Sequence, residues 1–282
     1  MSVQKIGIVG VGQMGSGIVH IAAMAGFDIV AMDQSGDHNI KAQSTIKKQF
    51  LKGVEKGKLT ADVAAAAEGK VKWTESLKDF SSCDLIIEAI IENPKIKEDL
   101  FKALDQVCEA KTILATNTSS ISITGLAAVT KRPQQVIGMH FFNPVPVMKL
   151  LEVIRAVQTD DATYQACVAA GTKMGKTVVT AKDSAAFIVN RTLLPFLNEA
   201  IFTLYEGVGS AEDIDKAVKL GLNHPMGPLE LCDFVGLDTL LAVLDVMSKE
   251  FGDPKYRACP LLRKYVEAGW YGRKAGRGFY KY

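Results

Sequence analysis

Short apolar runs alternate with helical hydrophobic patterns along the first two thirds of the chain. The run Ile6–Val9 lies between Lys5 and Gly10, and its unbroken apolar character predicts a strand buried on both faces. A helical pattern over Met14–Ala25 and a second strand over Asp28–Met32 follow. Further strands are predicted at Val71–Thr74, Leu85–Ala89, Ile113–Thr116, Val136–Met139, Leu150–Ile154 and Thr177–Thr180, with a helix at Pro94–Val107. This alternation predicts an α/β fold with a doubly wound, mostly parallel sheet of Rossmann-like type.

The strand pattern stops after about Asp183, and the rest of the chain is predicted to be helical. The expected helices are Ala186–Glu206, Ala211–Leu220, Leu229–Met247 and Pro260–Ala268, separated by turns that contain glycine or proline. We therefore predict an α/β domain over residues 1–183, with a helical insertion at about 38–69, and an all-α domain over residues 184–282. The apolar stripes of these four helices have little to cover them, which predicts a homodimer through this region.

A glycine-rich turn joins the first predicted strand to the first predicted helix. It reads GVGQMG over residues 10–15, the GxGxxG spacing of a dinucleotide-binding fold. Gly10 permits the tight turn, Gly12 lets the backbone approach a pyrophosphate, and Gly15 lets the helix pack closely on the strand. Gln13 and Met14 open the helix, whose first N–H groups would face the phosphates. These five residues are therefore the expected pyrophosphate site.

An acidic residue, Asp33, ends the second predicted strand, about 20 residues beyond the glycine turn. A carboxylate at this position accepts hydrogen bonds from the ribose hydroxyls of the adenosine. It would repel a 2′-phosphate, and no Arg follows in Gln34, Ser35 or Gly36. The sequence therefore favours NAD over NADP as the cofactor.

Polar side chains follow several strands of the predicted sheet: Glu92, Asn117, Ser119 and His140. In doubly wound sheets the carboxyl ends of the strands carry the chemistry. We therefore expect these residues to lie at one edge of the sheet, near the cofactor.

His140 and Glu152 lie on two predicted strands joined by a link that contains Pro144 and Pro146. Proline forces extended or turn backbone, so the two strands can bring an imidazole beside a carboxylate. Such a pair can transfer a proton, because the carboxylate selects the tautomer and stabilises the imidazolium. The same spacing also suits a structural polar pair in the core, and the spacing leaves both interpretations open.

Two further polar features lie on predicted helices. Lys48, Lys52 and Lys56 share one face of the insertion, which is either a solvated basic face or a clamp for a polyanionic substrate tail. Asn190 shares a face with apolar residues such as Leu194, so when buried it needs a hydrogen-bond partner from the protein or from a substrate.

The composition narrows the classes of function. Hydrophobic residues make up 48% of the chain and charged residues 23%, with a net charge of +2, which does not favour a nucleic-acid partner. No apolar stretch approaches the roughly 18–20 residues of a membrane span. The 5 cysteines are scattered with no metal-ligand spacing, so we expect no metal and a reducing compartment. Only Ser2–Lys5 separate Met1 from the first apolar run, which leaves no room for a targeting segment and makes the cytoplasm the expected location.

The chain resembles the short-chain 3-hydroxyacyl-CoA dehydrogenases, most closely their bacterial 3-hydroxybutyryl-CoA dehydrogenase members. The resemblance rests on motifs from end to end: GVGQMGSGI at Gly10–Ile18, ATNTSSISI at Ala115–Ile123, GMHFFNPVPVMKLLEVI at Gly138–Ile154, FIVNR at Phe187–Arg191, NHPMGPLEL at Asn223–Leu231, DPKYR at Asp253–Arg257 and GRKAGRGFYKY at Gly272–Tyr282. It implies reversible NAD-dependent oxidation of the S isomer of a 3-hydroxyacyl-CoA.

The resemblance also implies roles for individual residues. It makes His140 the catalytic base and Glu152 its partner, with Ser119 and Asn190 bonding the reacting oxygens of the substrate. It implies cofactor contacts from Asp33, Glu92, Lys97, Asn117, Ser119, Asn143 and Lys274. It implies contacts from Lys52 and Lys56 to the CoA moiety, and dimerisation through the helical domain.

Two alternatives differ from this interpretation. A dehydrogenase of free 3-hydroxy acids would depend on a catalytic Lys, and the His140–Glu152 pair and the basic insertion argue against it. An NAD-binding protein without turnover would have no need of Ser119, His140, Glu152 and Asn190 together.

Overall fold

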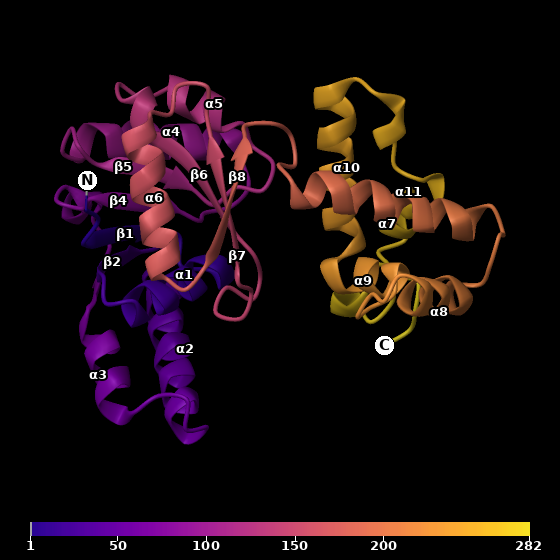
Figure 1. The fold of residues 1–282 in the computed structure, drawn as a ribbon, viewed down its shortest axis with the longest axis horizontal. Coiled ribbons are helices and arrows are strands. Elements are labelled where there is room, and N and C mark those ends of the chain that lie inside the picture. Colours follow the sequence, from indigo (N-terminus) through magenta and orange to yellow (C-terminus); the bar gives the residue numbers. More distant parts are fainter. Residues whose placement is uncertain (1) are drawn as a thin grey trace. The chain divides into compact units, whose positions relative to one another are not determined.

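A computed structural model describes residues 2–282 and divides into two compact units. The first unit ends at Ser184, and the second spans Ala185–Tyr282, so the division falls beside the boundary predicted at residue 183. The first unit is an α/β domain and the second is helical (Figure 1). The predicted fold class is therefore confirmed.

The first unit is built on an eight-stranded sheet with the order β3-β2-β1-β4-β5-β6-β7-β8. The strands are β1 (Lys5–Val9), β2 (Asp28–Met32), β3 (Val71–Thr74), β4 (Leu85–Glu88), β5 (Ile113–Thr116), β6 (Val136–Phe141), β7 (Leu150–Arg155) and β8 (Thr177–Lys182). Their ends lie within two residues of those predicted. Neighbouring strands are parallel except for β6 and β7, which run antiparallel. The reversal places the end of β6 opposite the middle of β7.

Helices cover the sheet and bury its apolar runs. They are α1 (Gln13–Met24), α2 (Gly36–Glu55), α3 (Ala61–Gly69), α4 (Pro94–Val107), α5 (Ile123–Ala128) and α6 (Asp161–Lys173), with short 3-10 turns at Leu77–Phe80 and Pro133–Gln135. The apolar side chains of β4 and β5 are buried throughout, as expected of strands covered on both faces. Neither α5 nor α6 was predicted from the sequence. The first is only six residues long, and small and polar residues dilute the hydrophobic period of the second.

The predicted helical insertion is formed by α2 and α3, which lie side by side and project from the sheet (Figure 1). The side chains of α2 that face the rest of the unit include Ala42, Ile46 and Phe50, spaced at helical intervals. The opposite face of α2 is polar and exposed. The insertion therefore presents a solvated face next to the dinucleotide-fold core.

The second unit packs five helices around its own apolar core, with 3-10 turns at Pro254–Tyr256 and Arg273–Ala275. The helices are α7 (Val189–Tyr205), α8 (Ala211–Gly221), α9 (Pro228–Val235), α10 (Leu237–Phe251) and α11 (Pro260–Glu267). The prediction of one helix over Leu229–Met247 was wrong. Gly236 interrupts it with φ of +103°, a backbone conformation that ends α9 and lets α10 start in a new direction.

Across residues 2–282, no helix combines the length and apolar character needed to cross a membrane.

Candidate active site

The glycine turn at the end of β1 has the geometry that close packing and ligand approach require. Gly10 has φ of +90°, which favours glycine. A Cβ on Gly15 would lie 1.8 Å from the Gly10 carbonyl oxygen, so only glycine fits where α1 crosses β1. A Cβ on Gly12 would instead meet no atom within 4 Å, because the exposed backbone there borders open space. The turn is tight on its inner side and accessible on its outer side.

Asp33 follows β2 and lies against the glycine turn. Its Oδ2 accepts a hydrogen bond from the Val11 N–H at 3.1 Å, and its Oδ1 lies 3.1 Å from Nδ1 of His38. Burial raises the cost of the charge, but hydrogen bonds from Val11, His38 and Ser35 outweigh it and hold the pKa of Asp33 below its usual value. The carboxylate is therefore ionised at neutral pH. His38 was not among the candidate residues, because nothing in the sequence at the start of α2 indicates that this side chain contacts Asp33.

These residues fit the adenosine half of NAD. The accessible Gly12 backbone and the N-terminus of α1 suit a pyrophosphate, and the ionised Asp33 suits a ribose diol. Gln13 and Met14 occupy the first turn of α1, as the sequence predicts. The side chains of Gln13 and Asn143 meet, with the Gln13 Nε2 donating to the Asn143 Oδ1 at 3.1 Å.

His140 and Glu152 face each other across the antiparallel β6–β7 pair. They are direct partners in the strand register, and the His140 Nδ1 lies 2.7 Å from the Glu152 Oε2. Glu152 is fully buried, and His140 is 7% exposed. A carboxylate at this distance makes Nδ1 the protonated nitrogen and leaves Nε2 as the basic one. The Asn117 Oδ1 accepts the Phe141 N–H at 2.8 Å and holds the strand just beyond His140.

The link between β6 and β7 is anchored by a buried lysine. The Lys176 ammonium donates to the carbonyl oxygens of Val145, at 2.5 Å, and Met148, at 2.7 Å. Burial lowers the pKa of Lys176. Lys176 was not predicted from the sequence, because nothing in the pattern before β8 distinguishes it from a surface lysine. It holds the segment that carries Asn143.

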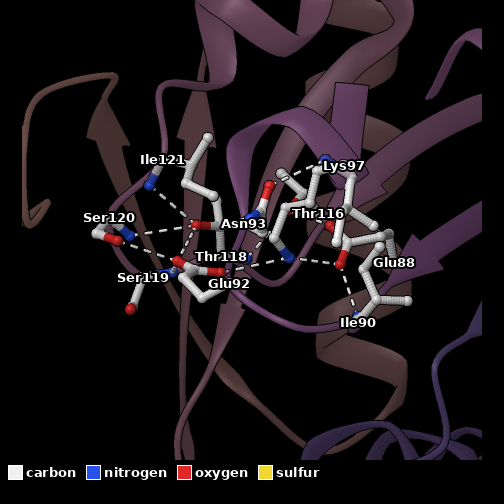
Figure 2. A network of polar contacts seen from close by, with 11 residues as sticks. Glu88, Ile90, Glu92, Asn93, Lys97, Thr116, Thr118, Ser119, Ser120 and Ile121 are labelled. Carbon is white, nitrogen blue, oxygen red and sulfur yellow. Dashed lines mark hydrogen bonds and ion pairs between the residues drawn. The ribbon is translucent and has the colours of Figure 1, made fainter. Parts of the chain in front are cut away.

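Glu92, Lys97 and Ser119 lie in one polar network beyond the ends of β4 and β5 (Figure 2). The Glu92 Oε1 accepts the Ser119 N–H at 3.2 Å, and Lys97 Nζ lies 3.3 Å from the Glu92 Oε2. Lys97 is buried, and a further carboxylate, Glu88, holds it at 2.5 Å. Glu88 was not among the sequence candidates, because it lies within the buried strand predicted at Leu85–Ala89.

The remaining candidates are distributed over both units. Lys48 and Lys52 lie on the exposed face of α2, and Lys56 follows at its end. Asn190 lies half-buried in the first turn of α7, and Lys274 binds Asp238 with 2.7 Å between Nζ and Oδ2. These two residues belong to the helical unit, so their roles at the site stay predictions.

The cysteines are free and buried. Burial raises the pKa of the Cys83 and Cys167 thiols to about 12, so neither is a nucleophile at neutral pH. Among residues 2–282, no group of three or more His, Cys, Asp or Glu side chains is arranged to hold a metal ion.

Comparison with known proteins gives matches over the whole chain. The family model for the NAD-binding domain of 3-hydroxyacyl-CoA dehydrogenase matches residues 5–184, and the model for the C-terminal domain of the same family matches residues 187–282. A 3-hydroxybutyryl-CoA dehydrogenase of Bradyrhizobium diazoefficiens is 51% identical over 99% of this chain and 96% of its own length. A probable 3-hydroxybutyryl-CoA dehydrogenase of Bacillus subtilis is also 51% identical, over 100% and 98% of the two chains.

Solved structures agree with these matches. The crystal structure of (S)-3-hydroxybutyryl-CoA dehydrogenase from Ralstonia eutropha superposes with a TM-score of 0.98 at 47% identity and covers 100% of this chain and 99% of that one. The fold and the sequence therefore point to the same group of proteins.

Proposed function

The chain belongs to the 3-hydroxyacyl-CoA dehydrogenase family, and we propose that it interconverts (S)-3-hydroxybutyryl-CoA and acetoacetyl-CoA with NAD. The observation that carries this proposal is the buried 2.7 Å contact between His140 and Glu152 in a domain with an NAD-binding turn. An imidazole paired with a carboxylate in this way is suited to remove a proton from a substrate hydroxyl. The names of the relatives support the choice of a four-carbon CoA thioester.

His140 acts as the general base in the direction of oxidation. Its Nε2 takes the proton of the C3 hydroxyl, while the Glu152 carboxylate accepts Nδ1–H and stabilises the imidazolium. NAD, when bound, supplies the acceptor for the hydride that leaves C3. In reduction the imidazolium returns the proton to the oxygen of the 3-oxo group.

Other residues bind and orient the reactants. The hydroxyl of Ser119 and the amide of Asn190 hydrogen-bond the reacting oxygens of the substrate. Lys52 and Lys56 attract the phosphates of CoA, which their exposure on the outer face of α2 permits. Of the cofactor contacts, Asp33 has the clearest support, because it is ionised and lies beside the glycine turn.

We also propose that the enzyme is a cytoplasmic homodimer that associates through its helical unit. Large apolar side chains are exposed there, among them Val208 (73%), Leu220 (77%) and Leu222 (59%). Burial of such side chains stabilises association. Sedimentation velocity tests the dimer, since a monomer at micromolar concentration contradicts it.

The free, buried thiols agree with a reducing compartment.

The experiment that tests the activity follows NADH absorbance after addition of acetoacetyl-CoA. We expect NADH consumption with the thioester and none with free acetoacetate, and NADPH should be used poorly. Turnover of the free acid alone would indicate the dehydrogenase of free hydroxy acids. If NADH binds but no 3-oxoacyl-CoA is reduced at saturation, the protein is a binding protein and the proposed activity is wrong.

A further inference from the structure

Glu88 is the carboxylate at the end of β4, and it is completely buried. Its Oε1 accepts the Ile90 N–H at 2.7 Å and the Lys97 ammonium at 2.5 Å, and its Oε2 accepts the Thr116 hydroxyl at 2.7 Å. A buried carboxylate is costly unless such partners compensate its lost hydration. Both oxygens are compensated here, by groups from β5, from α4 and from the turn after β4.

Lys97 connects this buried carboxylate to a second one. Its side chain is 1% exposed, and the ammonium lies between Glu88 and Glu92. Glu92 is 40% exposed and lies 3.3 Å from the ammonium. The ion pairs of Lys97 therefore extend from the core, at Glu88, to the surface of the domain, at Glu92. Glu88 and Glu92 thus share the Lys97 ammonium, which links the position of the exposed carboxylate to that of the buried one.

Glu92 in turn fixes the loop after β5. Its Oε1 accepts hydrogen bonds from the Thr118 hydroxyl, from the Ser119 N–H at 3.2 Å and from the Ser120 hydroxyl at 3.0 Å. The Thr118 Oγ1 then accepts the N–H groups of Ser120, at 3.2 Å, and Ile121, at 2.9 Å. Glu92 therefore binds the backbone N–H of Ser119. The hydroxyl of Ser119 points away from the network (Figure 2).

A second route joins Glu88 to the same loop. The Thr116 Oγ1 donates to Glu88 and accepts the Thr118 N–H at 3.1 Å. The Asn117 N–H bonds the Glu88 carbonyl oxygen at 2.8 Å. The four consecutive amides of Thr118 to Ile121 thus all bond side chains of this network and not a neighbouring strand.

We propose that Glu88 is a positioning residue for the reaction: through Lys97 and Thr116 it holds Glu92 and the loop 117–121 so that the Ser119 hydroxyl faces the reactants. This inference rests on the proposed function, since that function gives Ser119 its role. Glu88 is fully buried, so its effect on the reactants would be indirect. Its effect passes through hydrogen bonds that a neutral side chain would weaken, because hydrogen bonds between charged groups are the stronger kind.

The test compares Glu88→Gln with Asp99→Asn. Both convert a carboxylate to an amide, but Asp99 is an exposed residue of α4 whose partners Lys95 and Lys102 lie outside the network. Hydrogen exchange of the ligand-free protein reports the loop directly. We expect the amides of residues 118–121 to exchange at least about tenfold faster in the Glu88→Gln protein and to be unchanged in the Asp99→Asn protein.

Kinetics separate positioning from a merely structural role. For folded Glu88→Gln protein we expect kcat to fall at least about tenfold, because small misplacements of a reacting group are costly, and the dissociation constant of NADH to rise. Thr116→Val keeps the side-chain shape and removes only the bridging hydroxyl. In Thr116→Val we expect the same changes as in Glu88→Gln, faster amide exchange and a lower kcat, but smaller ones. This variant tests the positioning role if the Glu88→Gln protein does not fold.

Two results would overturn the inference. One is amide exchange of the wild-type rate in the folded variants. The other is faster exchange with kcat and NADH affinity within twofold of wild type, which would make the network a structural feature only. If the wild-type protein reduces no 3-oxoacyl-CoA, the proposed function fails separately, and NADH affinity together with amide exchange still decides the role of Glu88.

Discussion

His140 and Glu152 are direct partners in the antiparallel register of β6 and β7, with 2.7 Å between the Nδ1 of one and the Oε2 of the other. The contact joins two residues on the inner strands of a sheet, where both are buried. A rigid scaffold of this kind fixes the orientation of the imidazole before a substrate binds.

Replacement of the imidazole should abolish the proposed proton transfer. In His140→Gln we expect kcat to fall by about 10²–10⁴-fold, the usual contribution of a general base, while the dissociation constant of NADH changes little. Stopped-flow single turnover and NADH fluorescence titration measure the two quantities. Near-native turnover would show that another group takes the proton.

Replacement of the carboxylate should have a smaller effect. In Glu152→Gln an amide oxygen can still accept Nδ1–H, but the charge that stabilises the imidazolium is lost. We expect kcat to fall by about 10–100-fold, with NADH affinity preserved. An unaltered rate would assign the pair a structural role.

The two glycines of the turn should separate binding from stability. Gly12→Ala places a Cβ in open space, so we expect an unchanged melting temperature and weaker NAD binding. Gly15→Ala places a Cβ 1.8 Å from a backbone oxygen, which should destabilise the domain by about 1–3 kcal/mol. Calorimetric melting and NADH titration distinguish the two. If both substitutions lower the stability equally, the space beside Gly12 is not open and this interpretation of the turn is wrong.

Asp33 should make stability depend on acid pH. Its pKa is lower in the folded protein than the ordinary value of 3.8, so its stabilising effect is fully present above about pH 4 and is lost as the pH falls through the folded value. The difference in unfolding free energy between wild type and Asp33→Asn should therefore be constant at neutral pH and shrink in acid. Urea titrations from pH 7 to pH 3 measure it. A difference that grows in acid would reverse the sign of the inferred shift.

Charge reversal on α2 should weaken binding of the CoA thioester without changing binding of NADH. In Lys52→Glu/Lys56→Glu we expect the KM for acetoacetyl-CoA to rise about tenfold at low salt and the effect to weaken at high salt. The NADH dissociation constant should stay the same. Lys102→Glu, which reverses the charge of a lysine of α4 whose side chain is 43% exposed, is the control variant. If the two variants have equal KM values for acetoacetyl-CoA, Lys52 and Lys56 form only a solvated surface and do not bind CoA.

Local sequence determined the strands, the glycine turn and the position of Asp33 almost completely. These features depend on apolar runs and on residues adjacent in the chain, such as Gly10 and Gly12, whose backbone roles are the same in any fold of this class. The break of the predicted Leu229–Met247 helix was missed. Gly236 is a single residue in a strongly apolar pattern, and its positive φ is decided by how α9 and α10 pack.

Only the tertiary structure decided which polar residues meet. The sequence left His140 and Glu152 as either a proton relay or a core pair, and their contact depends on strand register, where a slip of one residue would turn Glu152 to the opposite face. Glu88 was not predicted as a candidate, because the sequence does not show whether a carboxylate near the end of a strand is solvated or buried. Its partners Lys97 and Thr116 come from other elements, and long-range packing alone brings them within hydrogen-bond distance.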